Sequence, residues 1–281
     1  MKIGITGARG RLAPLLLRHF HDQGAEVSQY SRVGKDGVLP LTELFQNPPK
    51  DMLIHCAWST VPLTAEADPD AFDREDLPLL KKIVQATAGH GTRIVFPSSG
   101  AIYGNTGDSP ASEDDLPNPL GAYAKAKIAA ENFLLENATS RVFILRATNL
   151  LGEAGDPQKP QGILPRFVDS ALKGSVVELW GDGSATKDYV HYSDFFTGLE
   201  AALNSGSPGL WNVGCGISYS LLEIIQIVED LTQKKINLVH RPHFDWDVTH
   251  SQICVDKLRA TGWQPKKSLS GAIEDFLHRT K

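Results

Sequence analysis

The sequence predicts an α/β protein whose core is a mostly parallel β-sheet. The first observation is the order of elements at the N-terminus, where a short strand (residues 2–6) leads through glycines into a long apolar helix pattern. The second is that strand-like and helix-like segments alternate over the first 150 residues with short connections. The third is a length of 281 residues with 41% hydrophobic residues, enough to bury a full core. Together they predict a Rossmann-like, doubly wound parallel sheet with a smaller C-terminal lobe.

The N-terminal strand, Lys2–Thr6, is followed directly by the glycine turn GARGRLA and then by a helix pattern that stops at Gly24. In a pyrophosphate site, Gly7 permits the tight turn, Gly10 lets the backbone approach the phosphates, and Ala13 allows close packing of helix on strand. The helix N-terminus adds N–H donors and the positive end of its dipole. We therefore expect a dinucleotide to bind here, at Gly7, Arg9, Gly10, Arg11 and Leu12.

The second strand, Glu26–Tyr30, ends at Ser31 and Arg32. An NAD-preferring site would usually place Asp or Glu here to bind the ribose 2′-hydroxyl. A hydroxyl and a guanidinium suit a 2′-phosphate instead, so the sequence favours NADP(H). NAD(H) stays possible, because Asp36 is a candidate for a displaced acid.

The following segments continue the alternation. The predicted elements are a strand at Asp51–Cys56, a helix at Asp70–Ala88, a strand ending at Ser98 and Ser99, a helix from Asn118 and Pro119 to about Glu136, and a strand at Val142–Leu145. Ala57, just past the third strand, is expected in the cofactor site. Glu75 and Asp76 are interpreted as solvent-facing or capping residues.

Tyr123 and Lys127 lie four residues apart in the Ala-rich helix, so both side chains project from one face. An ammonium held near a phenol favours the phenolate, and we expect the pKa of Tyr123 to fall from its usual value of about 10. A phenol whose pKa is lowered in this way can act as a general acid or base near neutral pH. Ser98 and Ser99 lie at the carboxyl end of a buried strand, and open α/β folds place their active sites at the carboxyl ends of the strands.

The composition of the sequence changes after Gly152. Residues 153–162 are predicted as a loop, and later elements are a helix at about Leu164–Lys173, the strand VVELW, the turn GDGSATKDYVHYSD, a helix at Ser193–Ala202, the strand LWNVG, a helix at Ser220–Thr232, a strand at Lys235–His240 and two short helices. We expect residues 1–162 to form the dinucleotide-binding domain. Residues 163–281 are expected to form mainly a substrate-binding lobe, with parts of 190–232 returning to the sheet.

Composition excludes several classes of partner. A net charge of −5 and a pI near 6.0 argue against binding to nucleic acid or an acidic membrane, and no apolar run reaches the length of a membrane span. The three cysteines, Cys56, Cys215 and Cys254, show no CxxC spacing, and no metal site is expected. Strand-like sequence beginning at Lys2 leaves no room for a signal peptide. These features predict a cytoplasmic protein.

Several motifs in this order make the chain resemble the extended short-chain dehydrogenase/reductases, the NAD-dependent epimerase/dehydratase family that acts on nucleotide sugars. The resemblance covers almost the whole chain. It depends on TGARGRLA (Thr6–Ala13), LIHCA (Leu53–Ala57), SSGAIYG (Ser98–Gly104), YAKAK (Tyr123–Lys127), LRATNLLG (Leu145–Gly152), GDGSATKDYVHYSD (Gly181–Asp194), WNVGCG (Trp211–Gly216) and WQPKKSL near the C-terminus.

The resemblance implies roles for individual residues. Ser99 would hydrogen-bond the reacting sugar oxygen, Tyr123 would transfer the proton, and Lys127 would lower the pKa of the phenol and hold the nicotinamide ribose. The diphosphate of the sugar nucleotide would contact Asn149, Lys187 and Arg241. Lys187 stands where the family more often has Arg, and because a lysine brings charge without the bidentate fork of an arginine, weaker binding of the phosphates is expected. Family members commonly dimerise through the helix that carries Tyr123, so a homodimer is expected.

A departure from the family narrows the reaction. The family's 4,6-dehydratases carry an acidic pair just after the catalytic hydroxyl, where this chain has Gly100 and Ala101, which cannot do acid–base work. Two reactions at C4 remain, reduction of a nucleotide-4-keto-(6-deoxy)sugar with NADPH and 4-epimerisation with bound NAD. Arg32 favours the reductase. A non-catalytic NADP(H) sensor or scaffold, and a reductase or dehydrogenase of a non-nucleotide carbonyl, are the further alternatives.

Overall fold

The chain forms two compact units, each assembled from segments that are separate in the sequence. A computed structural model describes residues 1–107, 109–152, 162–244 and 247–280. Unit 1 comprises Met1–Ile102, Gly121–Arg146 and Ala202–Trp211, and unit 2 comprises Tyr103–Leu120, Ala147–Ala201 and Asn212–Lys281. The loop predicted at 153–162 lies, except for its last residue, outside the described residues.

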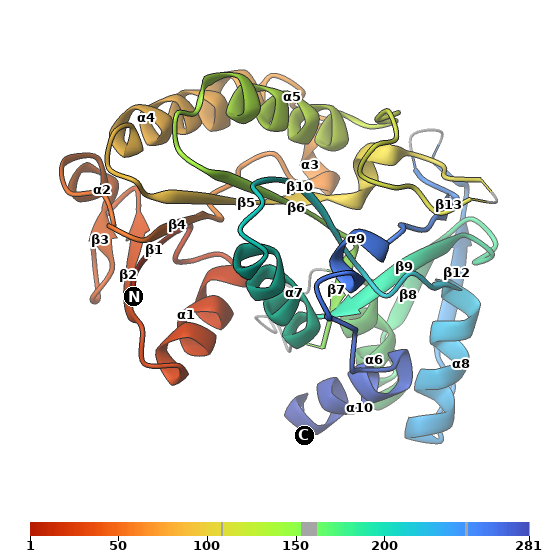
Figure 1. Ribbon diagram of the computed structural model, residues 1–281. Coiled ribbons are helices and arrows are strands. Elements are labelled where there is room, and N and C mark those ends of the chain that lie inside the picture. Colours follow the sequence, from red (N-terminus) through yellow and green to blue (C-terminus); the bar gives the residue numbers. More distant parts are fainter. Residues whose placement is uncertain (108, 153–161, 245–246, 281) are drawn as a thin grey trace. The chain divides into compact units, whose positions relative to one another are not determined.

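A seven-stranded sheet forms the centre of unit 1 (Figure 1). Its strands pair in the order β10-β6-β5-β4-β1-β2-β3, and the pairs β1·β2, β1·β4, β2·β3 and β4·β5 are parallel. This confirms the predicted doubly wound sheet. The strands are β1 (Lys2–Thr6), β2 (Glu26–Ser31), β3 (Leu39–Pro40), β4 (Met52–His55), β5 (Arg93–Ser99), β6 (Val142–Ala147) and β10 (Gly209–Val213).

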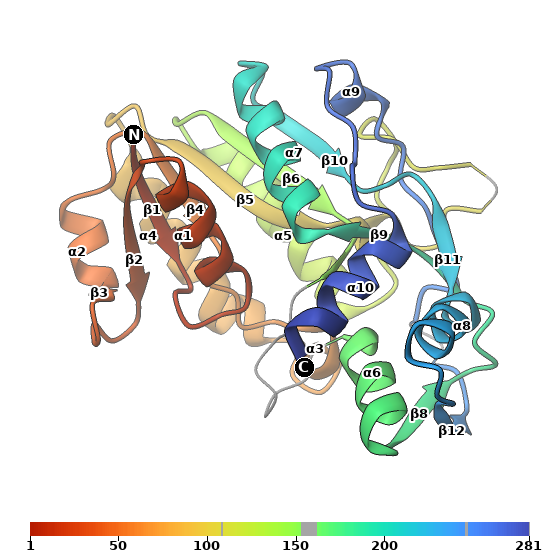
Figure 2. The ribbon, with the colours of Figure 1, turned by 90° about the horizontal axis from the view of Figure 1, so that it is seen from below.

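Helices cover both faces of this sheet. Figure 2, seen from below, shows α1 (Leu12–Asp22) in front of the strands, with α4 (Leu77–Thr87) and α5 (Ala122–Asn137) behind them. The core between the sheet and the helices behind it includes Leu80, Ile83, Phe96, Ala130 and Leu134, each fully buried. The shorter helices are α2 (Leu41–Gln46), α3 (Pro62–Ala65), the π-helix η1 (Phe72–Asp76) and the 3₁₀-helix η2 (Gly100–Tyr103).

Two predicted helices of unit 1 begin differently from the expectation. The helix predicted at Asp70–Ala88 starts with the π-helical turn η1, because Pro78 at the start of α4 has no N–H to donate to the carbonyl four residues earlier. The helix predicted from Asn118 begins only at Ala122. Gly121 before it is extended, and the carboxylate of Glu66 accepts the N–H of Ala122.

Unit 2 contains two small sheets. In the first, β9 (Thr186–His191) pairs with β7 (Asn149–Leu151), β11 (Ser218–Ser220) and β13 (His250–Ser251); in the second, β8 (Val176–Trp180) pairs in parallel with β12 (Asn237–Arg241). The turn predicted over Gly181–Asp194 is therefore wrong for most of its length. Its residues 188–191 are buried in a strand, and Asp188 is tolerated there because its carboxylate accepts two backbone N–H groups.

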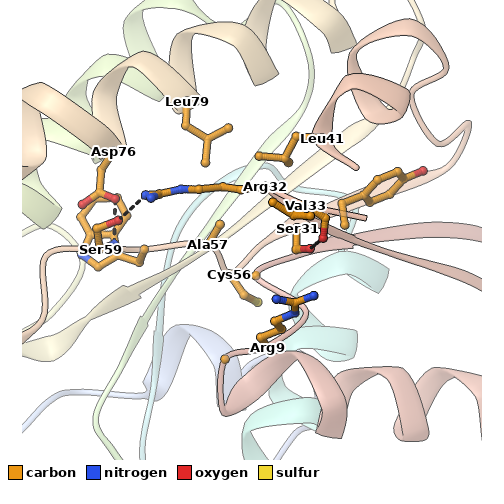
Figure 3. Close-up of a pocket in the computed structure, with 14 residues that line it drawn as sticks. Arg9, Ser31, Arg32, Val33, Leu41, Cys56, Ala57, Ser59, Asp76 and Leu79 are labelled. Atoms are coloured by element: carbon orange, nitrogen blue, oxygen red, sulfur yellow. Dashed lines mark hydrogen bonds between the residues drawn. The ribbon is translucent and has the colours of Figure 1, made fainter. Parts of the chain in front are cut away.

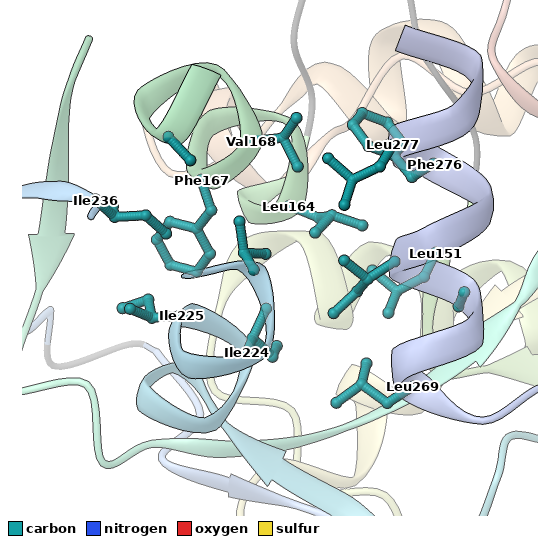
Figure 4. Close-up of a cluster of buried hydrophobic side chains, with 14 of the residues drawn as sticks. Leu151, Leu164, Phe167, Val168, Ile224, Ile225, Ile236, Leu269, Phe276 and Leu277 are labelled. Atoms are coloured by element: carbon teal, nitrogen blue, oxygen red, sulfur yellow. The ribbon is translucent and has the colours of Figure 1, made fainter. Parts of the chain in front are cut away.

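Helices α6 (Ile163–Lys173), α8 (Leu221–Thr232) and α10 (Leu269–Thr280) of unit 2 pack around a second hydrophobic core. Figure 4 shows Leu164 and Phe167 of α6, Ile224 of α8, and Phe276 and Leu277 of α10 pointing into one cluster. Helix α8 begins with a capping box, in which the hydroxyl of Ser220 accepts the N–H of Glu223 and the Glu223 carboxylate accepts the N–H of Ser220. The helices are α6 (Ile163–Lys173), α7 (Tyr192–Asn204), α8 (Leu221–Thr232), α9 (Asp256–Arg259) and α10 (Leu269–Thr280).

Candidate functional site

The turn between β1 and α1 is shaped so that only glycine fits at its first position. Gly7 has φ +74°, and a Cβ added there would lie 2.7 Å from the backbone nitrogen of Ala57. Thr6 joins the same two strand ends, since its Oγ accepts the N–H of Ala57 at 3.1 Å and lies 2.8 Å from Nδ1 of His55. The first turn of α1 carries no acidic side chain, so its N–H groups and dipole present an uncompensated positive end.

A cavity of about 330 Å³ lies beside this turn, within unit 1 (Figure 3). Six of the residues predicted to bind the cofactor line it: Gly7, Arg9, Gly10, Ser31, Arg32 and Ala57. Arg11, Leu12, Tyr123 and Lys127, which were also predicted to bind the cofactor, are not among the lining residues. Arg11 is the N-cap of α1 and Leu12 its first residue. Trp58, Ser59 and Asp76, which were not predicted as site residues, also line the cavity.

Arg32 reaches across this cavity to an acid that was expected to face solvent or cap a helix. Its Nη2 lies 2.5 Å from Oε2 of Glu75 and 3.1 Å from Oγ of Ser59. Glu75 belongs to the π-helix η1, and the hydrogen bonds from Arg32 and Ser59 hold the pKa of its carboxyl below the usual value. Asp36, the candidate displaced acid, is exposed and lies 3.9 Å from Nζ of Lys35; it does not line the cavity.

Asp76 is also not a solvent-facing residue. It is 2% exposed, and its carboxylate accepts the N–H groups of Ser59 and Thr60 at 2.8 and 3.0 Å and the Thr60 hydroxyl at 2.7 Å. These bonds fix the segment after β4 that forms one wall of the cavity. Sequence reasoning missed Glu75 and Asp76 because their partners are 16 to 43 residues away.

Ser99, Tyr123 and Lys127 come together at the end of β5 and the start of α5. The Tyr123 phenol lies beside Ser99, which lowers the pKa of the phenol, and the Ser99 Oγ accepts the N–H of Ala101 at 3.2 Å. The Nζ of Lys127 lies 5.9 Å from the centre of the Tyr123 ring. The three residues predicted to be catalytic are therefore neighbours in unit 1.

The ammonium of Lys127 does not face the phenol as expected. It donates to the carbonyl of Pro97 at 2.9 Å and lies 3.9 and 4.5 Å from the ring centres of Trp58 and Phe96. Burial lowers the pKa of Lys127 to about 7, although the nearby Asp76 and Glu131 oppose this. Burial raises the pKa of Tyr123, and only the neighbouring Ser99 acts against it. The predicted lowering of the Tyr123 pKa is thus wrong, because burial raises this pKa and the ammonium contacts Pro97 and two aromatic rings instead of the phenol oxygen.

A buried ionic network supports this part of α5. Glu131, one turn after Lys127, accepts Nε and Nη2 of Arg146 at 3.1 and 2.8 Å and also accepts the hydroxyl of Ser98. All three side chains are buried. The network ties α5 to β5 and β6, and it gives Ser98 a structural partner that the sequence alone did not identify.

The residues assigned to the substrate diphosphate lie on unit 2 and already have partners. Asn149 on β7 donates to the carbonyl of Asp188 at 2.9 Å, and Lys187 on the adjacent β9 lies 2.8 Å from Oδ1 of Asp247. Arg241 lies on the separate β8·β12 sheet, where Nε and Nη2 contact Oε1 of Glu178 at 3.0 and 2.6 Å. The structure thus places Asn149 and Lys187 on paired strands and Arg241 on another sheet.

Neither a metal site nor a membrane-spanning helix is found in the part of the chain that the structure describes. Among those residues, no group of His, Cys, Asp and Glu side chains has the geometry to hold a metal ion. None of the helices found there combines the length and the apolar character needed to cross a bilayer.

Comparison with known proteins identifies the family. The chain matches the NAD dependent epimerase/dehydratase family over residues 3–214 and therefore belongs to it, as the motifs predicted. It is 28% identical over 204 residues to a UDP-glucose 4-epimerase of Mycolicibacterium smegmatis, a match that covers 68% of this chain and 64% of the relative. It is 28% identical over 196 residues to a dTDP-4-dehydro-6-deoxyglucose reductase of Escherichia coli, covering 66% of this chain and 60% of the relative. Both matches thus span less than two thirds of the relative.

The fold is shared with solved structures over nearly the full chain. The crystal structure of the Thermus thermophilus UDP-glucose 4-epimerase in complex with NAD superposes with a TM-score of 0.89 at 25% identity, and covers 99% of this chain and 98% of that one. MoeE5 in complex with UDP-glucuronic acid and NAD also gives 0.89, at 24% identity, with 100% and 99% coverage. These likenesses confirm the Rossmann-like fold.

Proposed function

We propose that this protein transfers hydride between a nicotinamide cofactor and C4 of a nucleotide sugar. One observation carries the proposal: the Tyr123 phenol lies beside Ser99, and Lys127, one helical turn away, lies on the ring of Trp58, which lines the glycine-turn cavity. A proton-transferring phenol near a cavity shaped for a dinucleotide is the arrangement that hydride chemistry at a carbinol or ketone requires.

The residues around the glycine turn fit a dinucleotide. The tight turn that Gly7 permits, the uncapped start of α1 and the side chain of Arg9 suit a pyrophosphate, while Ser31, Arg32 and Ala57 suit the adenosine half. When bound, the nicotinamide supplies the hydride-accepting or hydride-donating carbon. Ser99 would hold the sugar oxygen at C4, and Tyr123 would give a proton to that oxygen or take one from it.

The favoured reaction is NADPH-dependent reduction of a nucleotide-4-keto-(6-deoxy)sugar. Gly100 and Ala101 begin the 3₁₀-helix η2 after Ser99 and bring no acid or base, which disfavours dehydration. Arg32 at the end of β2 offers a guanidinium to a 2′-phosphate. The second candidate is 4-epimerisation with bound NAD, which is favoured by the carboxylate of Glu75 beside Arg32.

The nucleotide diphosphate is proposed to bind unit 2, at Asn149, Lys187 and Arg241. Lys187 and Arg241 would then share their N–H donors between the phosphates and the carboxylates of Asp247 and Glu178. We also propose a homodimer. The cytoplasm is the proposed compartment, and the three free cysteines fit its reducing conditions.

The test combines a substrate panel with one variant. NADPH consumption is measured with 4-keto-6-deoxysugars linked to UDP, GDP, CDP and dTDP, and epimerisation is followed with the matching 4-hydroxy sugars and NAD. Y123F should slow the active reaction by about 10²-fold or more while still binding the dinucleotide, because it loses the transferable proton. Comparable turnover in Y123F would exclude the mechanism. Dinucleotide binding without conversion of any substrate would favour the sensor alternative.

A further inference from the structure

One side of the cavity holds a three-way contact between Arg32, Ser59 and Glu75. Figure 3 shows the Arg32 side chain extended across the cavity toward Ser59. Its Nη2 contacts both Oγ of Ser59 and Oε2 of Glu75, and the Ser59 hydroxyl donates to the same Glu75 oxygen at 3.0 Å. The guanidinium that the sequence offers to a 2′-phosphate is therefore already paired with a carboxylate of this chain.

The two partners of this ion pair differ in how firmly they are held. The Glu75 side chain is 34% exposed, sits on the π-helix η1 and accepts the hydroxyl of Ser59, whose own N–H is held by the buried Asp76. The Arg32 side chain is 69% exposed and follows the end of β2. The guanidinium is thus the partner free to turn toward a ligand, whereas the carboxylate stays in place.

NADP(H) and NAD(H) differ in the group that they would present to Arg32 and Glu75, a 2′-phosphate in one and a ribose 2′-hydroxyl in the other. A 2′-phosphate brings about two negative charges, so it has to compete with Glu75 for Arg32 and is repelled by the same carboxylate. A ribose 2′-hydroxyl carries no charge and can donate a hydrogen bond to a carboxylate. Glu75 offers from η1 the acidic group that is missing at the end of β2.

We propose that Glu75 is a specificity-determining residue that lowers the preference for NADP(H) over NAD(H) by competing for the guanidinium of Arg32. The proposal rests on the proposed dinucleotide function of this cavity and defines its cofactor selectivity. Arg32 and Glu75 act together: the arginine attracts a 2′-phosphate, and the glutamate limits that attraction.

The experiment measures the dissociation constants of NADPH and NADH for the full chain, without a sugar substrate, by the quenching of tryptophan fluorescence. E75Q removes the charge and keeps the shape, and it should raise the NADPH-over-NADH affinity ratio by about tenfold. The matched control is D73N, which removes the same charge from an exposed position of the same π-helix. D73N should change the ratio by less than about twofold, because long-range exposed charges are screened.

Two further variants separate the failure of this proposal from failure of the proposed function. R32A should lower the NADPH-over-NADH ratio, and E75Q should have a smaller effect in the R32A background than in the wild type. E75D, which keeps the charge but shortens its reach, should also raise the ratio if E75Q does not fold. Equal ratios for E75Q and D73N, or equal effects of E75Q with and without Arg32, would overturn the role of Glu75. An unchanged ratio in R32A would instead refute the proposed NADP(H) preference, and failure of both dinucleotides to bind the wild type would refute the cavity's function.

Discussion

Lys127 shows how burial and function compete at a single residue. Lys127 is 5% exposed, and its ammonium lies against two aromatic rings and one carbonyl. Within the part of the chain that the structure describes, no carboxylate forms a salt bridge with it. A buried ammonium is unfavourable unless it is compensated, which is why its pKa falls to about 7. Strongly shifted pKa values of buried groups are concentrated at functional sites.

We expect K127M to raise the stability of the protein while removing its activity. The pKa of Lys127 is about 7 when folded and about 10 when unfolded, so wild-type stability increases as the pH rises from 7 toward 10. The gain from K127M should therefore be larger at pH 6 than at pH 9, by about 2 kcal/mol. Urea unfolding at the two pH values measures it. The control is K125M, an exposed lysine of the same helix, and an equal gain for both variants would contradict the prediction.

At the scale of an element, β9 depends on a buried carboxylate. Asp188 accepts the N–H groups of Cys215 and Gly216 at 3.0 and 2.8 Å and the Thr148 hydroxyl at 3.4 Å, and so joins three segments of unit 2. Burial raises the pKa of Asp188 to about 7. The same residue explains why this strand looked like a turn, since an acid in the middle of a strand is uncommon without such partners.

D188A should destabilise unit 2 by about 1–3 kcal/mol, because two buried N–H groups lose their acceptor. The folded pKa lies above the unfolded value, so the stability that Asp188 contributes is full at low pH and lost as the pH rises through about 7. The loss in D188A should accordingly be larger at pH 5 than at pH 8. Thermal unfolding at both values checks this, and a loss that does not change with pH would count against a buried, protonated Asp188.

At the scale of the whole molecule, the features that were predicted correctly from the sequence are those set by residues close together in the chain. The strand Lys2–Thr6, the glycine turn and the one-turn spacing of Tyr123 and Lys127 are local, and the structure has each where the sequence placed it. The pairing of Arg32 with Glu75 joins residues 43 apart, and the position of the Lys127 ammonium depends on Trp58. Neither follows from periodicity, because each is set by tertiary packing.

The proposed homodimer gives a prediction at the same scale. A chain of 30.6 kDa should behave as a particle of about twice that mass, near 61 kDa, in light scattering. L135E on α5, where Leu135 is 49% exposed, should shift the protein toward the single-chain mass if the helix carrying Tyr123 forms the interface. A wild-type mass near 31 kDa over a wide concentration range would exclude the dimer.

The last strand of the seven-stranded sheet, β10, lies at one end of the strand order beside β6, yet some 60 residues separate the two along the chain. A ribosome that makes this protein therefore releases six strands well before the seventh arrives. Until then β6 presents an open hydrogen-bonding edge, the kind of surface that invites pairing with a neighbouring nascent chain. Slow translation between residues 147 and 209 would lengthen that exposure, so the demand for a holding chaperone should be greatest there.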